Sequence, residues 1–304
     1  MPKAAPHELP FAHPEAFLEG QTLVVDKPLT WTSFDVVNKL RYALRGFTGV
    51  KKIKVGHAGT LDPLATGVLV VCCGRATKTI DTLQAQDKVY TATIRLGAHT
   101  PSLDAETEVD AWASDPEVVR GLSMEDVAKA AAQWTGPLEQ RPPMYSAKKV
   151  GGVKAYKAAR KGETLQLRLS QVTVHAFEVL AMRGEDVDGH PVLDVDVNIR
   201  CSKGTYIRSL ARDLGESLGV GGTLTALCVG CPAVISMCAT LGTSKTLWRV
   251  STRRTQLLEF LWVSCPFALT RKVFFAIFAR LGNDLLRPDP TTSPETPQPW
   301  PCKE

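Results

Sequence analysis

Several segments of the chain alternate apolar and polar residues, which is the pattern of strands with one buried face. In PVLDVDVNIRCS, residues 191–202, two valines and an isoleucine share one face, while Asp194, Asp196 and Asn198 share the other. The continuous apolar run VLVVCC instead predicts a strand buried on both faces. Strands are predicted at residues 23–25, 68–73, 89–97, 164–180 and 191–202.

Helical spacing of apolar residues occurs in other segments. We expect one helix to have Ser33 as its N-cap and to end at Gly46. Its predicted apolar face consists of Phe34, Val37, Leu40 and Leu44. A capping-box spacing opens a second helix at Ser123, and a third follows the turn at residues 203–206. Strands and helices mix without a regular βαβ rhythm, which predicts an α+β fold with a mixed, largely antiparallel sheet flanked by helices.

The composition, 44% apolar over 304 residues, is that of a globular chain with a substantial core. No signal peptide pattern opens it, so we expect a cytoplasmic protein with reduced thiols. The most apolar stretch, Leu257–Leu281, is interrupted by Glu259, Pro266 and the pair Arg271–Lys272, and its uninterrupted runs are too short to cross a membrane.

The sequence lacks the motifs of several enzyme classes, which argues against nucleotide-cofactor, serine-hydrolase and metal chemistry. The sequence has no GxxxxGK[ST] or GxGxxG loop for a nucleotide cofactor and no GxSxG nucleophile elbow. Its histidines show no i,i+4 pairing, and Cys228 and Cys231 form a CxxC without a second pair, so we expect no metal and no cofactor. One carboxylate, Asp62, stands out in the loop GHAGTLDPLATG, where an Asx turn is the alternative reading.

Three segments of the chain are rich in lysine and arginine. They are KKIK at residues 51–54, MYSAKKVGGVKAYKAARKG at 144–162 and RCSKGTYIR at 200–208. Cations follow a phosphate backbone and aromatic rings stack on bases, so this interleaving of basic and tyrosine residues is typical of an RNA-binding groove. The alternative is that each segment is simply a solvated surface.

The motif GHAGTLDPLATGVL resembles the catalytic motif of the TruB family of tRNA pseudouridine synthases. The resemblance extends through VVDKPLTWTSFDVV, VYTATIRLG, PPMYSAKKVGGVKAYKAARKGE and CSKGTYIRSLARDLGESLG, and covers roughly residues 20–227. It implies the pseudouridine synthase fold and a cofactor-free isomerase that acts on uridine 55 in the T arm of tRNA. We expect a monomer whose partner is the T-arm stem-loop.

The resemblance also implies roles for individual residues. Asp62 is the catalytic nucleophile, Arg208 its charged partner, Tyr206 the phenol near carbon 5 and Tyr90 the ring that stacks on the everted base. Substrate-binding roles fall on Lys27, His57 and Leu227. The basic segments described above add Lys51, Lys52, Lys54 and Lys203 as candidate contacts to the RNA. For Tyr90 and Tyr206 the alternative is a core aromatic with a satisfied hydroxyl, and for Lys27 it is a surface turn.

The resemblance stops at residue 228, where the expected pair of arginines is replaced by CVGCPAV. We interpret residues 1–19 as a flexible segment, 20–227 as the catalytic domain, and 228–304 as a non-matching tail with a frameshift or an extension as its origin. Its proline-rich end is expected to be disordered from about residue 287. Two rival functions stay open: an RNA-binding or tRNA-folding protein without catalysis, and a glycoside hydrolase, which normally needs two neighbouring carboxylates.

Overall fold

A computed structural model describes residues 13–230 and 261–262 of the chain. Their elements are α1 (Pro14–Glu19), β1 (Gln21–Lys27), α2 (Ser33–Thr48), β2 (Val55–His57), β3 (Ala65–Cys73), the 3₁₀-helix η1 (Gly74–Thr79), α3 (Ile80–Ala85), β4 (Lys88–Leu96), β5 (Ala98–His99), β6 (Ala111–Trp112), α4 (Pro116–Gly121), α5 (Met124–Gln133), β7 (Gly136–Gln140), β8 (Lys149–Val150), β9 (Val153–Lys154), α6 (Ala155–Ala159), β10 (Ser170–Val187), β11 (His190–Cys201), α7 (Ile207–Ser217), β12 (Gly222–Val229) and β13 (Leu261–Trp262). None of the described helices is long and apolar enough to cross a membrane.

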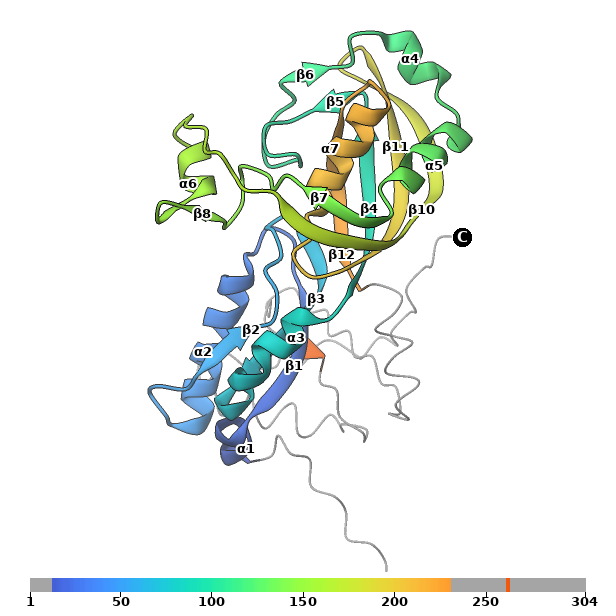
Figure 1. The fold of residues 1–304 in the computed structure, drawn as a ribbon. Helices are drawn as coiled ribbons and strands as arrows, with labels where there is room; N and C mark the ends of the chain where they lie inside the picture. Colours follow the sequence, from blue (N-terminus) through green and yellow to red (C-terminus); the bar gives the residue numbers. More distant parts are fainter. Residues whose placement is uncertain (1–12, 231–260, 263–304) are drawn as a thin grey trace, which may run out of the picture.

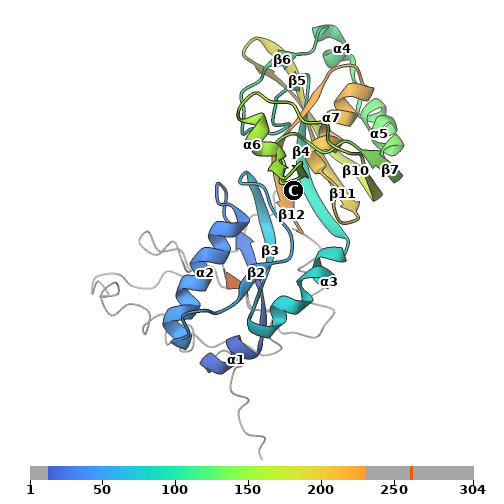
Figure 2. The ribbon, with the colours of Figure 1, turned by 60° about the vertical axis from the view of Figure 1, so that its left-hand side comes forward.

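One sheet runs through the molecule in the order β13-β1-β3-β12-β4-β11-β10-β7, with β2 added on β3. Strand β12 is parallel to β3, and the other pairings of this sheet within the described residues are antiparallel. Figures 1 and 2 show two parts along this sheet, one with β1–β3 and helices α1–α3, the other with β4, β7, β10, β11 and β12 and helices α4, α5 and α7. The predicted α+β class and largely antiparallel sheet are confirmed.

Each part has its own hydrophobic core. The buried residues of β4, β11, α5 and α7 form one cluster, and those of β1, β3 and α2 form the other. Tyr90 and Leu227 are partly buried and pack against both clusters. The two residues therefore mark the junction of the two parts, where loops from both can meet.

The alternating strands follow the predicted pattern, with one correction. In β11 the side chains of Val195, Val197 and Ile199 are fully buried, as expected. Strand β10, however, runs from Ser170 to Val187 and not from residue 164 to residue 180. Its partner β7 ends at Gln140, which pairs with Ser170, and the prolines at 142 and 143 cannot extend a ladder. Residues 164–169 therefore have no strand to pair with on that side.

Helix α2 is longer than predicted and begins differently. Thr32 is its N-cap, and Thr32 and Asp35 form a reciprocal capping box. The helix continues to Thr48 and ends at Gly49, whose φ of 70° suits a left-handed C-cap. The predicted N-cap Ser33 is buried in the first turn, and Phe34 is 58% exposed, not part of the apolar face. At the second predicted cap, Ser123 and Asp126 form a capping box as expected.

Three cysteines, Cys72, Cys73 and Cys201, are free and buried, in line with the expectation of reduced thiols. Strand β12 continues through Cys228 to Val229, just beyond the predicted domain boundary. Apart from Leu261–Trp262, which pairs with β1, the expectations for residues 1–12 and for the tail after residue 230 lie outside the described residues.

Candidate active site

Asp62 lies in the loop between β2 and β3, and contacts with α2 fix the backbone of this loop. The hydroxyl of Ser33 accepts a hydrogen bond from the Leu61 amide at 2.8 Å and lies 3.2 Å from the Leu61 carbonyl. On the other side of Asp62, its own carbonyl accepts from the amide of Ala65 at 3.1 Å. Ser33 therefore holds the loop of Asp62 and does not cap its own helix.

Lys27 supports the same loop from β1. Its side chain is buried, and Nζ donates to the carbonyls of Pro28, Trp31 and Pro63 at 2.8, 2.6 and 3.1 Å. Burial lowers the pKa of this ammonium to about 8, while the negative charge of Asp62 opposes the shift. Lys27 therefore joins the β1–α2 turn to the loop of Asp62, and the alternative of a surface turn is wrong.

We expect Lys27→Met to lower the free energy of unfolding by about 1–3 kcal/mol, because it leaves buried carbonyl acceptors without their donor. Urea unfolding followed by circular dichroism measures this change. Lys39→Met, an exposed lysine of α2, is the control and should stay within about 0.5 kcal/mol of the parent protein. Equal stability of the two variants would show that the three contacts contribute nothing to the fold.

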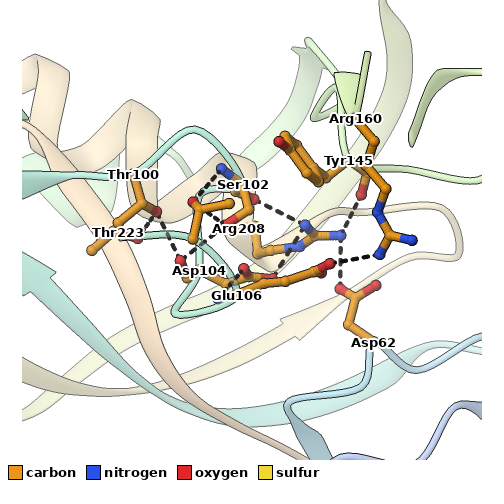
Figure 3. A network of polar contacts seen from close by, with 10 residues as sticks. Asp62, Thr100, Ser102, Asp104, Glu106, Tyr145, Arg160, Arg208 and Thr223 are labelled. Atoms are coloured by element: carbon orange, nitrogen blue, oxygen red, sulfur yellow. Dashed lines mark hydrogen bonds and ion pairs between the residues drawn. The ribbon is translucent and has the colours of Figure 1, made fainter. Parts of the chain in front are cut away.

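Arg208 is the second residue of α7 and is buried. Its guanidinium lies between two carboxylates, with Nη2 2.9 Å from Asp62 Oδ2 and Nη1 3.2 Å from Asp104 Oδ2. The same two nitrogens donate to the carbonyls of Tyr145 and Ser102, both at 2.9 Å. Figure 3 shows this arrangement, in which residues from three separate segments, the loops of Asp62, of Ser102 and Asp104, and of Tyr145, converge on one guanidinium. A planar fork with several donors is the group that suits such a position.

Opposing effects act on the Asp62 carboxyl. Burial raises its pKa, the Arg208 guanidinium lowers it, and the negative charges of Asp104 and Glu106 raise it again. The Asp62 side chain is nonetheless 36% exposed, against 4% for Arg208. Asp62 is therefore the member of the pair that a ligand can reach, and Arg208 is the buried group that favours its ionised form.

The loop that carries Asp104 is itself rigidly held. Thr100 Oγ1 and Ser102 Oγ donate to the Asp104 carbonyl at 2.8 and 3.0 Å, and Asp104 Oδ1 accepts from the Glu106 amide at 3.0 Å. An isolated bridge connects Asp104 to Leu224 of β12. The sequence analysis did not single out Asp104, although the cluster of Thr, Ser and Asp in TPSLDAET is a signal for such a side-chain-braced turn.

Tyr206 is the N-cap of α7, and the side-chain amide of Gln140 makes two hydrogen bonds with its backbone. The amide of Gln140 donates to the Tyr206 carbonyl at 3.1 Å and accepts from the Tyr206 N–H at 2.8 Å. Gln140 is 2% exposed and follows from no motif in the sequence. Burial raises the pKa of the Tyr206 phenol, and the charge of Asp62 adds to this rise.

Tyr90 reaches the same site from the centre of the sheet. In β4 it pairs with Ile199 on one side and with Val229 on the other. Burial raises the pKa of its phenol, and the charge of Asp62 contributes to this rise as well. The charge of Asp62 thus acts on the pKa values of Tyr90, Tyr206 and Lys27, three residues that are far apart in the chain.

Residues 45–207 match the family model described as TruB family pseudouridylate synthase, N-terminal domain. The chain belongs to the TruB family. The tRNA pseudouridine synthase B of Parabacteroides distasonis is 51% identical over 211 residues, which are 69% of this chain and 85% of the relative. That of Phocaeicola vulgatus is 49% identical with the same coverage. A solved Cbf5–Nop10–Gar1 complex is 26% identical over 71% of this chain and 51% of the matched one, with a TM-score of 0.48. The relatives confirm the resemblance inferred from the motifs.

Two further expected residues of this TruB-family chain border the site without contacting Arg208. His57 ends β2, and its Nδ1 donates to the Gly59 carbonyl at 2.7 Å, which shapes the turn before Asp62. Burial lowers the pKa of its imidazole, which favours the neutral ring. Leu227 of β12 pairs with Ala65 at the end of the Asp62 loop.

The structure does not bring the predicted basic residues of the TruB-family chain to the carboxylate. Lys51, Lys52 and Lys54 are exposed in the connection after α2. Helix α2 starts beside the Asp62 loop, and its 16 residues span about 24 Å, so the first two lysines lie at its remote end. Lys203 is exposed in the turn between β11 and α7. All four are exposed and are therefore candidates for contacts with a large ligand.

Proposed function

We propose that this protein is a tRNA pseudouridine synthase that converts uridine 55 of the T arm to pseudouridine without a cofactor. The observation that carries the proposal is the ion pair of Asp62 with a buried Arg208, in a chain of the TruB family. The curated relatives bear the name tRNA pseudouridine synthase B over the same part of the chain. As the partner we propose the T-arm stem-loop of tRNA, bound by a cytoplasmic monomer.

The reaction breaks the bond between the ribose and N1 of uracil, turns the base, and forms a bond from the ribose to carbon 5. Asp62 is the nucleophile that attacks the sugar or the base, and Arg208 keeps it ionised in a partly dry site. The last step removes a proton from carbon 5, while N1, which kept the electron pair of its bond to the ribose, takes up a proton. Because burial raises the pKa of Tyr206, its phenol is protonated at neutral pH and suits orienting the base. We therefore assign the removal of the proton to the carboxylate of Asp62.

The uridine must leave its stack to reach Asp62, which costs a few kcal/mol. The ring of Tyr90 offers a surface on which the everted base can stack, and stacking on an aromatic side chain contributes about 1–3 kcal/mol per base. Leu227 provides an apolar wall beside Tyr90, since both lie at the junction of the two cores. His57 and Lys27 act indirectly in this proposal, through the backbone of the loop that presents Asp62.

The two rival functions fit the site less well. A protein that only binds RNA gains nothing from a reachable carboxylate, which repels phosphates. A glycoside hydrolase needs a second carboxyl group facing the substrate. Asp104 supplies a second carboxylate close by, but its side chain is 7% exposed and is engaged by Arg208 and the Glu106 amide. It is therefore placed to support Arg208 and not to protonate a leaving group.

A carbodiimide-based assay on T-arm RNA tests the proposal. The purified full chain is incubated with the RNA, and primer extension detects a carbodiimide adduct at uridine 55. We expect a stop at this position that depends on protein and incubation time. Tight binding without any adduct would favour the RNA-binding alternative. Release of free uracil would instead indicate hydrolysis of the glycosidic bond.

Basic residues remote from Asp62 should affect binding and not chemistry. We expect the double variant Lys51→Gln, Lys52→Gln to bind tRNA more weakly and to show a smaller dependence of log Kd on log salt, by roughly 1–2 in slope. The rate under saturating tRNA should stay the same, because these lysines lie at the far end of α2. Fluorescence anisotropy over a salt series measures the slope. An unchanged slope would place the RNA on another surface.

A further inference from the structure

An ion pair joins two loops at the entrance to the site. Arg160, just after α6, places Nη2 2.8 Å from Oε1 of Glu106. Arg160 belongs to the basic segment 144–162, which carries β8, β9 and α6 and projects away from the sheet (Figure 1). The two side chains are 63% and 31% exposed. The pair therefore connects a projecting segment to the loop that holds Asp104, and solvent or a ligand can reach it.

Glu106 places this ion pair close to the carboxylate of Asp62. Figure 3 shows Glu106 and Arg160 beside the pair of Asp62 and Arg208. The backbone N–H of Glu106 donates to Asp104 Oδ1. Glu106 therefore belongs to the same turn as Asp104, which pairs with Arg208. Glu106 is also one of the negative groups that act on Asp62. Whatever contacts Arg160 lies next to the place where the uridine must arrive.

The charges around this entrance favour an exchange of partners. Three carboxylates, those of Asp62, Asp104 and Glu106, face two guanidinium groups, those of Arg208 and Arg160. Arg208 is buried between its own two partners and is unavailable to a phosphate. A partly exposed ion pair contributes little stability, whereas a guanidinium binds a phosphate through two parallel hydrogen bonds. Arg160, by contrast, is paired with one partly exposed carboxylate, so an RNA phosphate can replace Glu106 as its partner.

We propose that Arg160 exchanges Glu106 for a backbone phosphate of the substrate RNA as the uridine reaches Asp62. This inference rests on the proposed function, because it takes RNA as the ligand. Glu106 holds Arg160 at the entrance in the free protein and competes with the phosphate for it. No covalent step is involved.

A double-mutant cycle in RNA binding tests the exchange. Anisotropy measures Kd of the T-arm RNA for the full chain and for the variants Glu106→Gln, Arg160→Gln and the double variant, over a range of salt concentrations. Glu106→Gln removes the competitor and should tighten binding about two- to five-fold. Arg160→Gln should weaken binding and reduce the salt slope by about 0.7–0.9, the effect of one phosphate contact. In the Arg160→Gln background, Glu106→Gln should have little further effect.

Glu108→Gln is the matched control, since Glu108 is an exposed carboxylate close by in the chain. It reports the general effect of removing one negative charge and should not depend on Arg160. Weaker binding by Glu106→Gln would mean that the pair persists in the complex, and an equal effect of Glu106→Gln and Glu108→Gln would mean that no competition exists; either result overturns the exchange. Failure of the proposed function is distinguishable, because it appears as absent pseudouridine with the parent chain and not in the binding cycle.

Discussion

The variant Asp62→Asn is expected to lose pseudouridine formation by at least about 10⁴-fold, the scale on which removal of a central catalytic group acts. An amide has the shape of the carboxylate but neither its charge nor its nucleophilicity. The affinity for tRNA should change by no more than several-fold, because Asp62 offers RNA phosphates no attraction. Loss of the charge opposite Arg208 also leaves that guanidinium with Asp104 as its remaining carboxylate partner.

Single-turnover measurements of pseudouridine in T-arm RNA, with anisotropy for affinity, separate the two effects. Asp81→Asn is the control, because Asp81 is an exposed aspartate of α3 outside the site. The control should keep the parent rate. Turnover by Asp62→Asn close to that of the parent would remove Asp62 from the mechanism, even though the family and the fold would still stand.

The second large effect is expected for Arg208→Lys, although the substitution conserves the charge. An ammonium on a flexible chain cannot reproduce the planar fork that contacts Asp62, Asp104 and two carbonyls at once. At least one buried acceptor then loses its donor, which costs about 1–3 kcal/mol of stability. We expect the single-turnover rate to fall by about 10²–10³-fold, comparable to loss of a fixed electrostatic contact in other active sites.

The pH dependence of the same variant follows from the opposing effects on Asp62. Burial raises the pKa of its carboxyl, and Arg208 counteracts the rise. Weaker contact with the cation leaves the effect of burial less opposed, so the pKa of Asp62 rises further. Less of the carboxylate is then ionised at a given acidic pH. The acidic limb of the rate profile should therefore move to higher pH in Arg208→Lys.

Rate profiles between about pH 5 and 8 measure this shift, and urea unfolding measures the change in stability. Arg212→Lys is the matched control, because Arg212 lies one turn further along α7 and pairs with Asp213. It should keep both the rate and the pH profile of the parent. An unshifted profile in Arg208→Lys would show that Arg208 does not control the ionisation of Asp62.

Much of the fold follows from the local pattern of the sequence. The alternation in β11 and the run of β3 are visible because strand side chains point alternately to two faces, and burial selects their polarity. The helix boundaries predicted from the sequence are less accurate, as those of α2 illustrate. Ser33 is the predicted N-cap, but it contacts Leu61, which is distant in the chain, and the adjacent Thr32 is the cap. The ends of β10 likewise depend on where its partner strand stops.

The sequence by itself determined the family, and the family motifs pointed to Asp62, Tyr90, Tyr206 and Arg208 as candidate site residues, because such motifs fix the type of side chain at each position. Tertiary structure alone revealed Asp104, Gln140, Glu106 and the supporting contacts of Lys27. It also placed Lys51 and Lys52 at the far end of α2. The physical reason is that a motif fixes the type of side chain locally, whereas the charge and solvation that act on it come from segments which only the folded sheet brings within a few ångströms.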